Sequence, residues 1–247
     1  MATYTYNKVT PEVLEQIKAA ANGHVLVGDQ INEDFGHDEM RIYGEAMPEV
    51  LIEPTTTEEV AAVMKICNEN KIAVTPSGAR TALTGGPVAQ YGGVMISTTK
   101  MNKILGYDEE NLVVTIQPGV LLQDLADDAL KRGLMYPPDP GEKLATVGGN
   151  VSTNAGGMRA VKYGTTRDYV RGMTVVLPTG EIVKEGATVS KTSSGYSLLH
   201  LLIGSEGTLG IITEMTLKII VAPKLTMSII VPYETLEDAI ATVPKLF

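Results

Sequence analysis

The sequence has few residues that can stack or form disulfides: it contains no tryptophan, two phenylalanines and a single cysteine, Cys67. One cysteine cannot build an internal disulfide framework or a cysteine-based zinc or iron–sulfur site within the chain. Sites for single-stranded nucleic acid rely on aromatic stacking and on clustered lysine and arginine. The chain instead carries a net charge of −9, so we expect no nucleic-acid partner.

Long apolar runs are missing as well. No stretch approaches the roughly 18 apolar residues that a membrane-spanning helix requires, so we expect no transmembrane segment. The N-terminus lacks the apolar core behind a basic start that marks a secretory signal. Together with the single cysteine, this favours a cytoplasmic protein. The length of 247 residues allows one large or two modest domains.

Several familiar catalytic and phosphate-binding motifs are absent. The chain contains neither G-x-G-x-x-G nor G-x-x-x-x-G-K-[ST], and it lacks G-x-S-x-G. His24 and His37 lie in an irregular, acidic segment, residues 23–49, whose spacings match no metal-ligand pattern. We interpret that segment as a solvated connection without a metal. His200 lies within an apolar run, where a satisfied, partly buried histidine is favoured over a catalytic one. The catalytic residues stay unknown at this stage.

What the chain does contain is a stretch of small residues, ATVGGNVSTNAGG, at residues 145–157. Its two glycine pairs are costly in a helix or a central strand, so the composition predicts an irregular loop. Bare main-chain N–H groups, with small hydroxyl and amide side chains beside them, suit a bound phosphate or pyrophosphate. An ordinary glycine-rich surface loop is the alternative for this stretch taken alone.

A second loop of small residues, PSGARTALTGG at residues 76–86, follows a predicted β-α-β unit. Residues 50–52 and 72–74 are the expected strands, because both are short apolar runs bounded by turn residues. Two glycine-rich loops that each follow such a unit suit one extended ligand held from both sides.

The helix between these strands begins with a capping box, formed by Thr55/Glu58 or Thr56/Glu59. Apolar residues then recur at helical spacing as far as Cys67, which predicts one buried helix face. We therefore interpret Cys67 as a core residue and not as a nucleophile.

The other expected elements follow from the same patterns. Further strands are expected at residues 93–98, 112–117, 174–177, 181–184 and 211–221, and further helices after Thr10, at residues 122–129 and at residues 195–202. Residues 225–232 and 233–246 are predicted to form a strand and a helix. Because these two elements cannot close a domain, we expect the chain to stop inside its next domain.

A group of cations follows the central stretch: Arg159, Lys162, Arg167 and Arg171. They either neutralise the phosphates of a ligand or face a redox partner. The alternative is a solvated surface, and the sequence does not decide between them.

Five segments, in this order, carry a resemblance to a known family. They are PSGARTALTGG (76–86), QPGV (117–120), PPDPGEKLATVGGNVSTNAGG (137–157), KYGTTRDYV (162–170) and GSEGTLGIITEMTLKI (204–219). The chain resembles the FAD-binding domain of the vanillyl-alcohol oxidase type, also called PCMH-type, in the branch of D-lactate dehydrogenases and glycolate oxidase FAD subunits.

The resemblance implies an α+β fold in which FAD lies extended between two α+β subdomains. It covers residues 50–222, with subdomains at about 50–105 and 106–222. Residues 1–49 then form an N-terminal helical and irregular segment. Residues 223–247 are expected to begin a truncated substrate or cap domain.

The resemblance also implies which residues hold the cofactor. The loop at residues 76–84 would wrap the pyrophosphate with its main-chain N–H groups, while the central stretch would line the pyrophosphate, ribityl and flavin region. The implied cofactor-binding residues are Pro76, Ser77, Gly78, Ala79, Arg80, Thr81, Thr84, Pro118, Asp139, Thr146, Val147, Gly148, Gly149, Asn150, Ser152, Thr153, Gly156, Gly164, Glu206, Ile211 and Ile212.

Two residues depart from the family pattern. Members that attach FAD covalently often have a histidine where this chain has Thr81, so we predict non-covalent FAD. Arg80 occupies a position that is commonly glycine in this branch. Its guanidinium would clamp a phosphate, alter the field near the flavin, or point to solvent.

The function implied by the resemblance is FAD-dependent oxidation of a small D-2-hydroxy acid, D-lactate or glycolate, to the 2-oxo acid by hydride transfer. Electrons would pass to an electron-transfer flavoprotein, an iron–sulfur subunit or a quinone-linked carrier. The cap domain would supply the catalytic base and the group that binds the substrate carboxylate. Two alternatives remain: a non-catalytic FAD-binding electron-relay subunit, and a flavoenzyme similar to UDP-sugar reductases.

Overall fold

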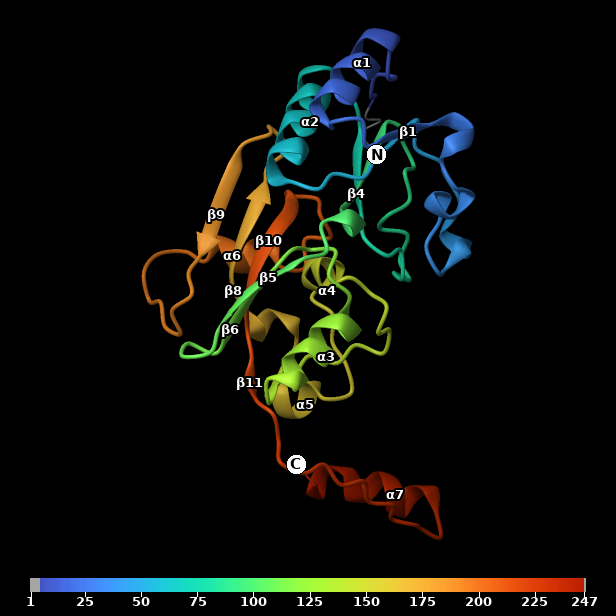
Figure 1. The fold of residues 1–247 in the computed structure, drawn as a ribbon. Helices are drawn as coiled ribbons and strands as arrows, with labels where there is room; N and C mark the ends of the chain where they lie inside the picture. The colour runs from blue at the N-terminus through green and yellow to red at the C-terminus, as the bar shows by residue number, and fades with distance from the viewer. Residues whose placement is uncertain (1–4, 247) are drawn as a thin grey trace.

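Two β-sheets organise the computed structural model, which describes residues 5–246 (Figure 1). The first sheet has four strands in the order β1-β2-β4-β3. Its strands are β1 (Val25–Val27), β2 (Val50–Ile52), β3 (Val74–Ser77) and β4 (Val94–Ser97). β4 lies between β2 and β3 and runs parallel to both, while β1 is an antiparallel edge strand.

The predicted β-α-β unit is confirmed, with β4 inserted between its two strands. The second strand starts later than expected, at Val74 and not at Ile72, because the ladder with β4 begins at Val74. Pro76 is tolerated inside β3 because β3 is the edge of the sheet, where a missing N–H costs no ladder hydrogen bond.

Helices α1 (Pro11–Ala20) and α2 (Thr57–Glu69) pack on this sheet. Of the two predicted capping boxes, only the N-cap half of the second is present: Thr56 Oγ1 accepts from Glu59 N at 3.2 Å. The Glu59 carboxylate turns to the main-chain N–H of Thr55, at 2.7 Å, instead of closing the box at Thr56. Cys67 is buried as predicted, and burial raises the pKa of its thiol to about 12.

The second sheet is antiparallel and has five strands in the order β5-β6-β10-β8-β9. They are β5 (Ile104–Asp108), β6 (Val113–Ile116), β8 (Val170–Val176), β9 (Ile182–Gly186) and β10 (Ile211–Lys218). Helices α3 (Leu122–Lys131), α4 (Val147–Thr153) and α6 (Leu198–Leu202) contribute buried side chains to its core. The short α5 (Ala160–Tyr163) and the β7–β11 pair (Leu134–Met135 with Ile220–Val221) complete this part.

The two sheets share a boundary. Val176 at the end of β8 and Ile211 at the start of β10 belong to the apolar cluster of the first sheet, beneath α2. The loops that leave β3 and enter β10 are therefore brought to the same region of the molecule, where α4 also lies (Figure 1).

The prediction of an irregular loop at residues 145–157 was wrong, because residues 147–153 form α4. Thr146 caps the helix, its Oγ1 accepting from Gly149 N at 3.3 Å, and Asn154 ends it in the left-handed region at φ 50°. Gly148 packs directly on Pro118, and a Cβ on Gly148 would lie 2.8 Å from the Pro118 carbonyl oxygen. Cap and close packing together outweigh the low helix propensity of glycine.

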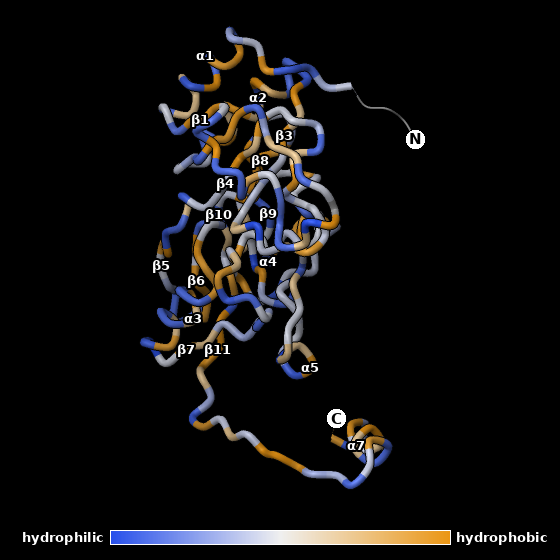
Figure 2. The backbone as a smooth tube through the Cα atoms, turned by 90° about the vertical axis from the view of Figure 1, so that its right-hand side faces the viewer, coloured by the Kyte–Doolittle hydropathy of each residue, from blue (hydrophilic) through white to orange (hydrophobic). Residues whose placement is uncertain are grey.

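The predicted strand at residues 225–232 was also wrong. This segment pairs with no strand among residues 5–246, and an unpaired extended segment leaves its backbone groups to solvent. The following helix is confirmed in shorter form as α7 (Leu236–Thr242), continued by a 3-10 helix, Val243–Lys245. Figures 1 and 2 show this arm standing away from the body of the molecule, and Ile230 within it is 93% exposed.

Between them, the helices of residues 5–246 include none with the length and apolarity needed to cross a bilayer.

Candidate functional site

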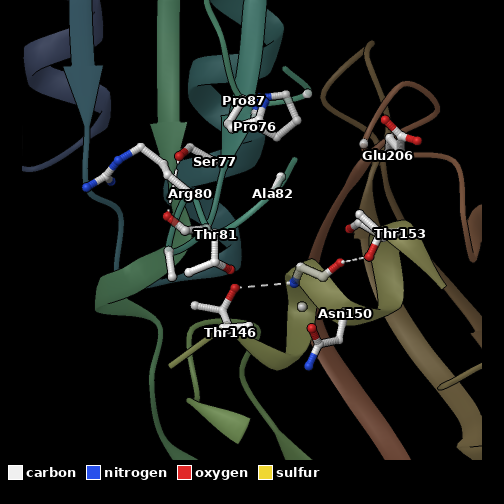
Figure 3. A pocket seen from close by; sticks show the side chains of 18 of the residues that line it. Pro76, Ser77, Arg80, Thr81, Ala82, Pro87, Thr146, Asn150, Thr153 and Glu206 are labelled. Carbon is white, nitrogen blue, oxygen red and sulfur yellow. Dashed lines mark hydrogen bonds between the residues drawn. The ribbon is translucent and has the colours of Figure 1, made fainter. Parts of the chain in front are cut away.

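A cavity of about 430 Å³ lies where the loop after β3, helix α4 and the turn before β10 meet (Figure 3). Its volume is within the range of ordinary small-molecule sites. The lining residues are Pro76, Ser77, Gly78, Ala79, Arg80, Thr81, Ala82, Leu83, Thr84, Gly86, Pro87, Thr98, Pro118, Pro140, Glu142, Ala145, Thr146, Gly148, Gly149, Asn150, Ser152, Thr153, Ala155, Glu206, Gly207, Gly210, Ile211 and Ile212. Small and neutral side chains predominate, so main-chain groups stay accessible.

The loop after β3 offers unused hydrogen-bond donors to this cavity. Within the part of the chain that the structure describes, no main-chain N–H of residues 78–84 donates a hydrogen bond to a protein acceptor. Unpaired main-chain donors are costly unless water or a ligand satisfies them. A run of them along one cavity wall is suited to an anionic, acceptor-rich group.

Helix α4 contributes differently, because its first N–H groups are already used. Val147 N donates to Val120 O at 2.8 Å, Gly148 N donates to Pro118 O at 2.9 Å, and Gly149 N donates to Thr146 Oγ1. The main-chain N–H groups of Gly148 and Gly149 are therefore paired within the protein, and Gly148 packs closely on Pro118. Both residues line the cavity, and the cofactor-binding role expected of them stays a prediction. What α4 does offer is Asn150, which is 5% exposed and whose Nδ2 finds no acceptor among the described residues.

Most of the predicted cofactor-binding residues line the cavity. The four that lie outside it are Asp139, Val147, Gly156 and Gly164. Their cofactor-binding role stays a prediction. Val147 is fully buried in the core of the second sheet, and Gly164 ends α5 next to Asp168. Asp139 forms ion pairs with Lys143 and, at 3.2 Å, with Arg159.

Sequence reasoning missed several lining residues. They are Gly86, Pro87, Thr98, Pro140, Glu142, Ala145, Ala155, Gly207 and Gly210, while Ala82 and Leu83 lie in the loop that was expected to wrap the pyrophosphate. Most of them are neighbours of predicted residues, so the segments were right and only the choice within them was incomplete. No sequence pattern around Thr98 indicates a binding role, because this residue is brought to the cavity only by the parallel pairing of β4 with β3.

Arg80 lines the cavity, but its guanidinium contacts a residue outside it. Its guanidinium lies 3.9 Å from the centroid of the Phe35 ring, and Figure 3 shows it pointing away from Thr146 and Thr153. The backbone of Arg80 is in the left-handed region at φ 61°, a conformation that glycine adopts most readily. Burial lowers the pKa of Arg80, and the carboxylates of Asp34 and Glu53 partly counter this. Stacking on Phe35 is thus a fourth possibility, which the sequence did not suggest.

The remaining cations and the histidines lie elsewhere. None of Arg159, Lys162, Arg167 and Arg171 lines the cavity; Arg159 pairs with Asp139, and Arg171 donates to Ser190 O at 3.1 Å. No histidine lines it either. His200 has its Nδ1 2.5 Å from Ser197 Oγ and is exposed, not partly buried as expected.

Residues 48–186 match the model of a family described as FAD binding domain. The chain belongs to this family. FAD is therefore the cofactor, and the donors of the cavity fit it, because pyrophosphate oxygens accept hydrogen bonds of the kind that residues 78–84 and Asn150 leave unused.

Relatives of this FAD-binding protein include two named enzymes. It is 76% identical to D-lactate dehydrogenase of Anaerostipes hadrus over 247 residues, all of this chain and 52% of that protein. It is 42% identical to glycolate oxidase subunit GlcD of Bacillus subtilis over 203 residues, 82% of this chain and 43% of that protein. The chain thus spans about half the length of the relatives it matches.

The fold of this FAD-binding protein is also that of a solved structure, p-cresol methylhydroxylase. The two superpose with a TM-score of 0.72 at 23% sequence identity, over 87% of this chain and 44% of that one. The PCMH-type α+β fold expected from the sequence is therefore confirmed.

Proposed function

We propose that this protein supplies the FAD-binding half of a dehydrogenase that oxidises a D-2-hydroxy acid, D-lactate or glycolate, to the 2-oxo acid. The observation that carries the proposal is the 76% identity, over all 247 residues, to a protein named D-lactate dehydrogenase. The GlcD relative extends the substrate class to glycolate. Because the chain spans about half of these relatives, the activity is proposed for the complete protein.

In this proposal the loop of residues 78–84 binds the pyrophosphate through its main-chain N–H groups. Asn150 supplies a further donor from α4. The many small glycine, alanine and threonine residues leave the backbone accessible, so that the main-chain N–H dipoles, and not solvent, surround the charged phosphates. FAD, when bound, supplies the capacity to accept a hydride, and the chain positions it and excludes water.

The cofactor is proposed to be held without a covalent bond. Thr81 occupies the position where the resemblance would have a linking histidine, and neither histidine nor cysteine lines the cavity. The side chains that most readily form stable links of this kind are thus missing from the walls.

The substrate half is proposed to begin within the C-terminal arm. Residues 223–246 follow β11 and carry exposed apolar side chains, among them Ile229 and Leu236. We propose that residues 50–222 are the FAD domain and that residues 223–247 form the beginning of the cap domain. The cap domain supplies the catalytic base and the group that binds the substrate carboxylate. An electron-transfer flavoprotein or an iron–sulfur subunit would then take the electrons, in the cytoplasm.

An anaerobic titration of the complete protein tests this proposal. D-lactate, L-lactate and glycolate are added separately while the absorbance of oxidised flavin is followed. Bleaching by D-lactate or glycolate, and not by L-lactate, is the expected result. An electron-relay subunit would bleach with none of the three. Bleaching only in a fourth titration, with NADPH, would favour a UDP-sugar reductase-like enzyme.

A further inference from the structure

The cavity loop, residues 78–86, is supported from outside by the segment at residues 32–40. This segment includes a short 3-10 helix, Glu33–Gly36, in the stretch between β1 and β2. It lies before residues 48–186, the part of the chain that the FAD binding domain family model matches. A support from this segment is therefore additional to the features that define the family.

The first contact is a buried carboxylate. Asp38 Oδ2 accepts from Gly85 N at 2.7 Å, and its other oxygen accepts from Met40 N at 2.9 Å. Asp38 is 3% exposed, contrary to the expectation that this acidic segment is solvated. Because both carboxylate oxygens of Asp38 accept from main-chain N–H groups, the end of the cavity loop at Gly85 is held in a fixed position relative to residues 38–40.

Two further contacts hold the middle of the loop. Glu39 N donates to Ala82 O at 3.2 Å, which ties the main chain at that position to the segment of residues 32–40. The Arg80 guanidinium stacks on Phe35. Phe35 in turn packs on the apolar cluster that contains Leu51 of β2 and Met95 of β4, which connects the loop to the first sheet.

The loop needs such support because it has little of its own. None of its N–H groups at residues 78–84 is hydrogen-bonded within the described protein, so no ladder or turn directs them toward the cavity. Arg80 is held at a positive φ, which a non-glycine residue adopts at a cost unless its surroundings fix it. Contacts at residues 80, 82 and 85 from one neighbouring segment account for the conformation.

We propose that residues 32–40 position the cavity loop for FAD, with Asp38, Phe35 and Arg80 as positioning residues that do not touch the cofactor through their charged or aromatic groups. The inference rests on the proposed role of residues 78–84 in binding the pyrophosphate. It goes beyond that role because it assigns part of the cofactor affinity to residues outside the matched family domain.

Asp38→Asn in the complete protein tests the proposal, with Glu33→Gln as the control that removes the same charge from an exposed neighbour. The dissociation constant for FAD is measured by calorimetry at a temperature where circular dichroism shows every variant folded. We expect Asp38→Asn to raise the dissociation constant about tenfold and Glu33→Gln to leave it unchanged. Hydrogen–deuterium exchange of the Gly85 amide, whose N–H donates to Asp38, should accelerate in the FAD-free protein only in Asp38→Asn.

A second pair of variants keeps the test valid if Asp38→Asn does not fold. Phe35→Leu and Arg80→Gln should each weaken FAD binding several-fold, and the double variant should be no weaker than the worse single one, because both remove the same contact. A lower unfolding temperature with unchanged FAD affinity and loop exchange would overturn the proposal and leave the FAD site intact. Failure of the wild-type protein to bind FAD would overturn both.

Discussion

Gly78 and Thr146 approach each other across the cavity so closely that a Cβ on Gly78 would overlap Thr146 Oγ1. Gly78 belongs to the loop after β3, and Thr146 is the cap of α4. The same hydroxyl accepts from Gly149 N, so it cannot move away without uncapping the helix. The loop after β3 and the N-terminus of α4, two walls of the cavity, are thus in contact at a position where only glycine fits.

Gly78→Ala should weaken FAD binding by about 5- to 150-fold, because overpacking of this size typically costs about 1–3 kcal/mol. The dissociation constant can be measured by isothermal titration calorimetry. Gly106→Ala is the matched control, since a Cβ at Gly106 would meet no atom within 4 Å.

Adding Thr146→Ala to Gly78→Ala should recover part of the lost affinity, because it removes the oxygen that the new methyl group meets. Recovery will be incomplete, since loss of the cap costs about 1 kcal/mol. Equal affinities for wild type and Gly78→Ala would show that the two walls do not control binding.

The unused N–H groups of residues 78–84 predict that the pyrophosphate contributes much of the affinity. ADP should therefore displace FAD at least about 30-fold more effectively than adenosine, which corresponds to about 2 kcal/mol from charge-assisted hydrogen bonds. Competition against FAD fluorescence gives both constants. If ADP and adenosine competed equally well, the prediction that this loop binds the pyrophosphate would be contradicted.

The absence of histidine and cysteine from the cavity walls predicts a dissociable cofactor. After acid precipitation, the flavin should be recovered in the supernatant, and mass spectrometry of the pellet should give the mass of the bare polypeptide. Flavin that stays with the pellet after denaturation would identify a covalent link and contradict this prediction.

Glu59 should stabilise the fold in a pH-dependent way. Burial alone would raise its pKa, but hydrogen bonds from the Thr55 main chain and the Asn22 amide outweigh burial, so its pKa is lowered. A carboxylate whose pKa is lower in the folded protein contributes stability above its unfolded pKa of about 4.3 and loses it as the pH falls.

Glu59→Gln is therefore expected to reduce the free energy of unfolding by about 1–2 kcal/mol at pH 7, with the difference shrinking as the pH drops below 4. Urea titrations at several pH values measure this. Glu58→Gln, at the exposed neighbouring position, provides the control. If the difference in unfolding free energy between wild type and Glu59→Gln did not change with pH, the stabilisation would come from packing and not from the charge of Glu59.

Regular amphipathic elements were predictable because their signal is local. The apolar face of α2, which ends at Cys67, and its cap at Thr56 follow from spacings within one short segment. Helix α4 was not predictable in this way. What stabilises it, the packing of Gly148 on Pro118, joins residues that are distant in sequence, so composition alone favoured a loop.

The sequence predicted the segments that form the candidate site, but not the contacts that hold the cavity loop in place. Small residues at 76–86 and the family resemblance identified the cavity loop. Nothing in the acidic run around Asp38 indicated that this carboxylate is buried against Gly85, 47 positions further along the chain. Likewise Arg80 was identified, but its stacking on Phe35 depends on the path of the segment between β1 and β2.

The central claim is that this cavity binds FAD, and a calorimetric titration of the FAD-free, folded protein with FAD tests it most directly. We predict one site per chain with a dissociation constant of about 1 μM or tighter, equivalent to at least about 8 kcal/mol. A folded protein that is colourless as purified and gives no binding heat with FAD would contradict the claim.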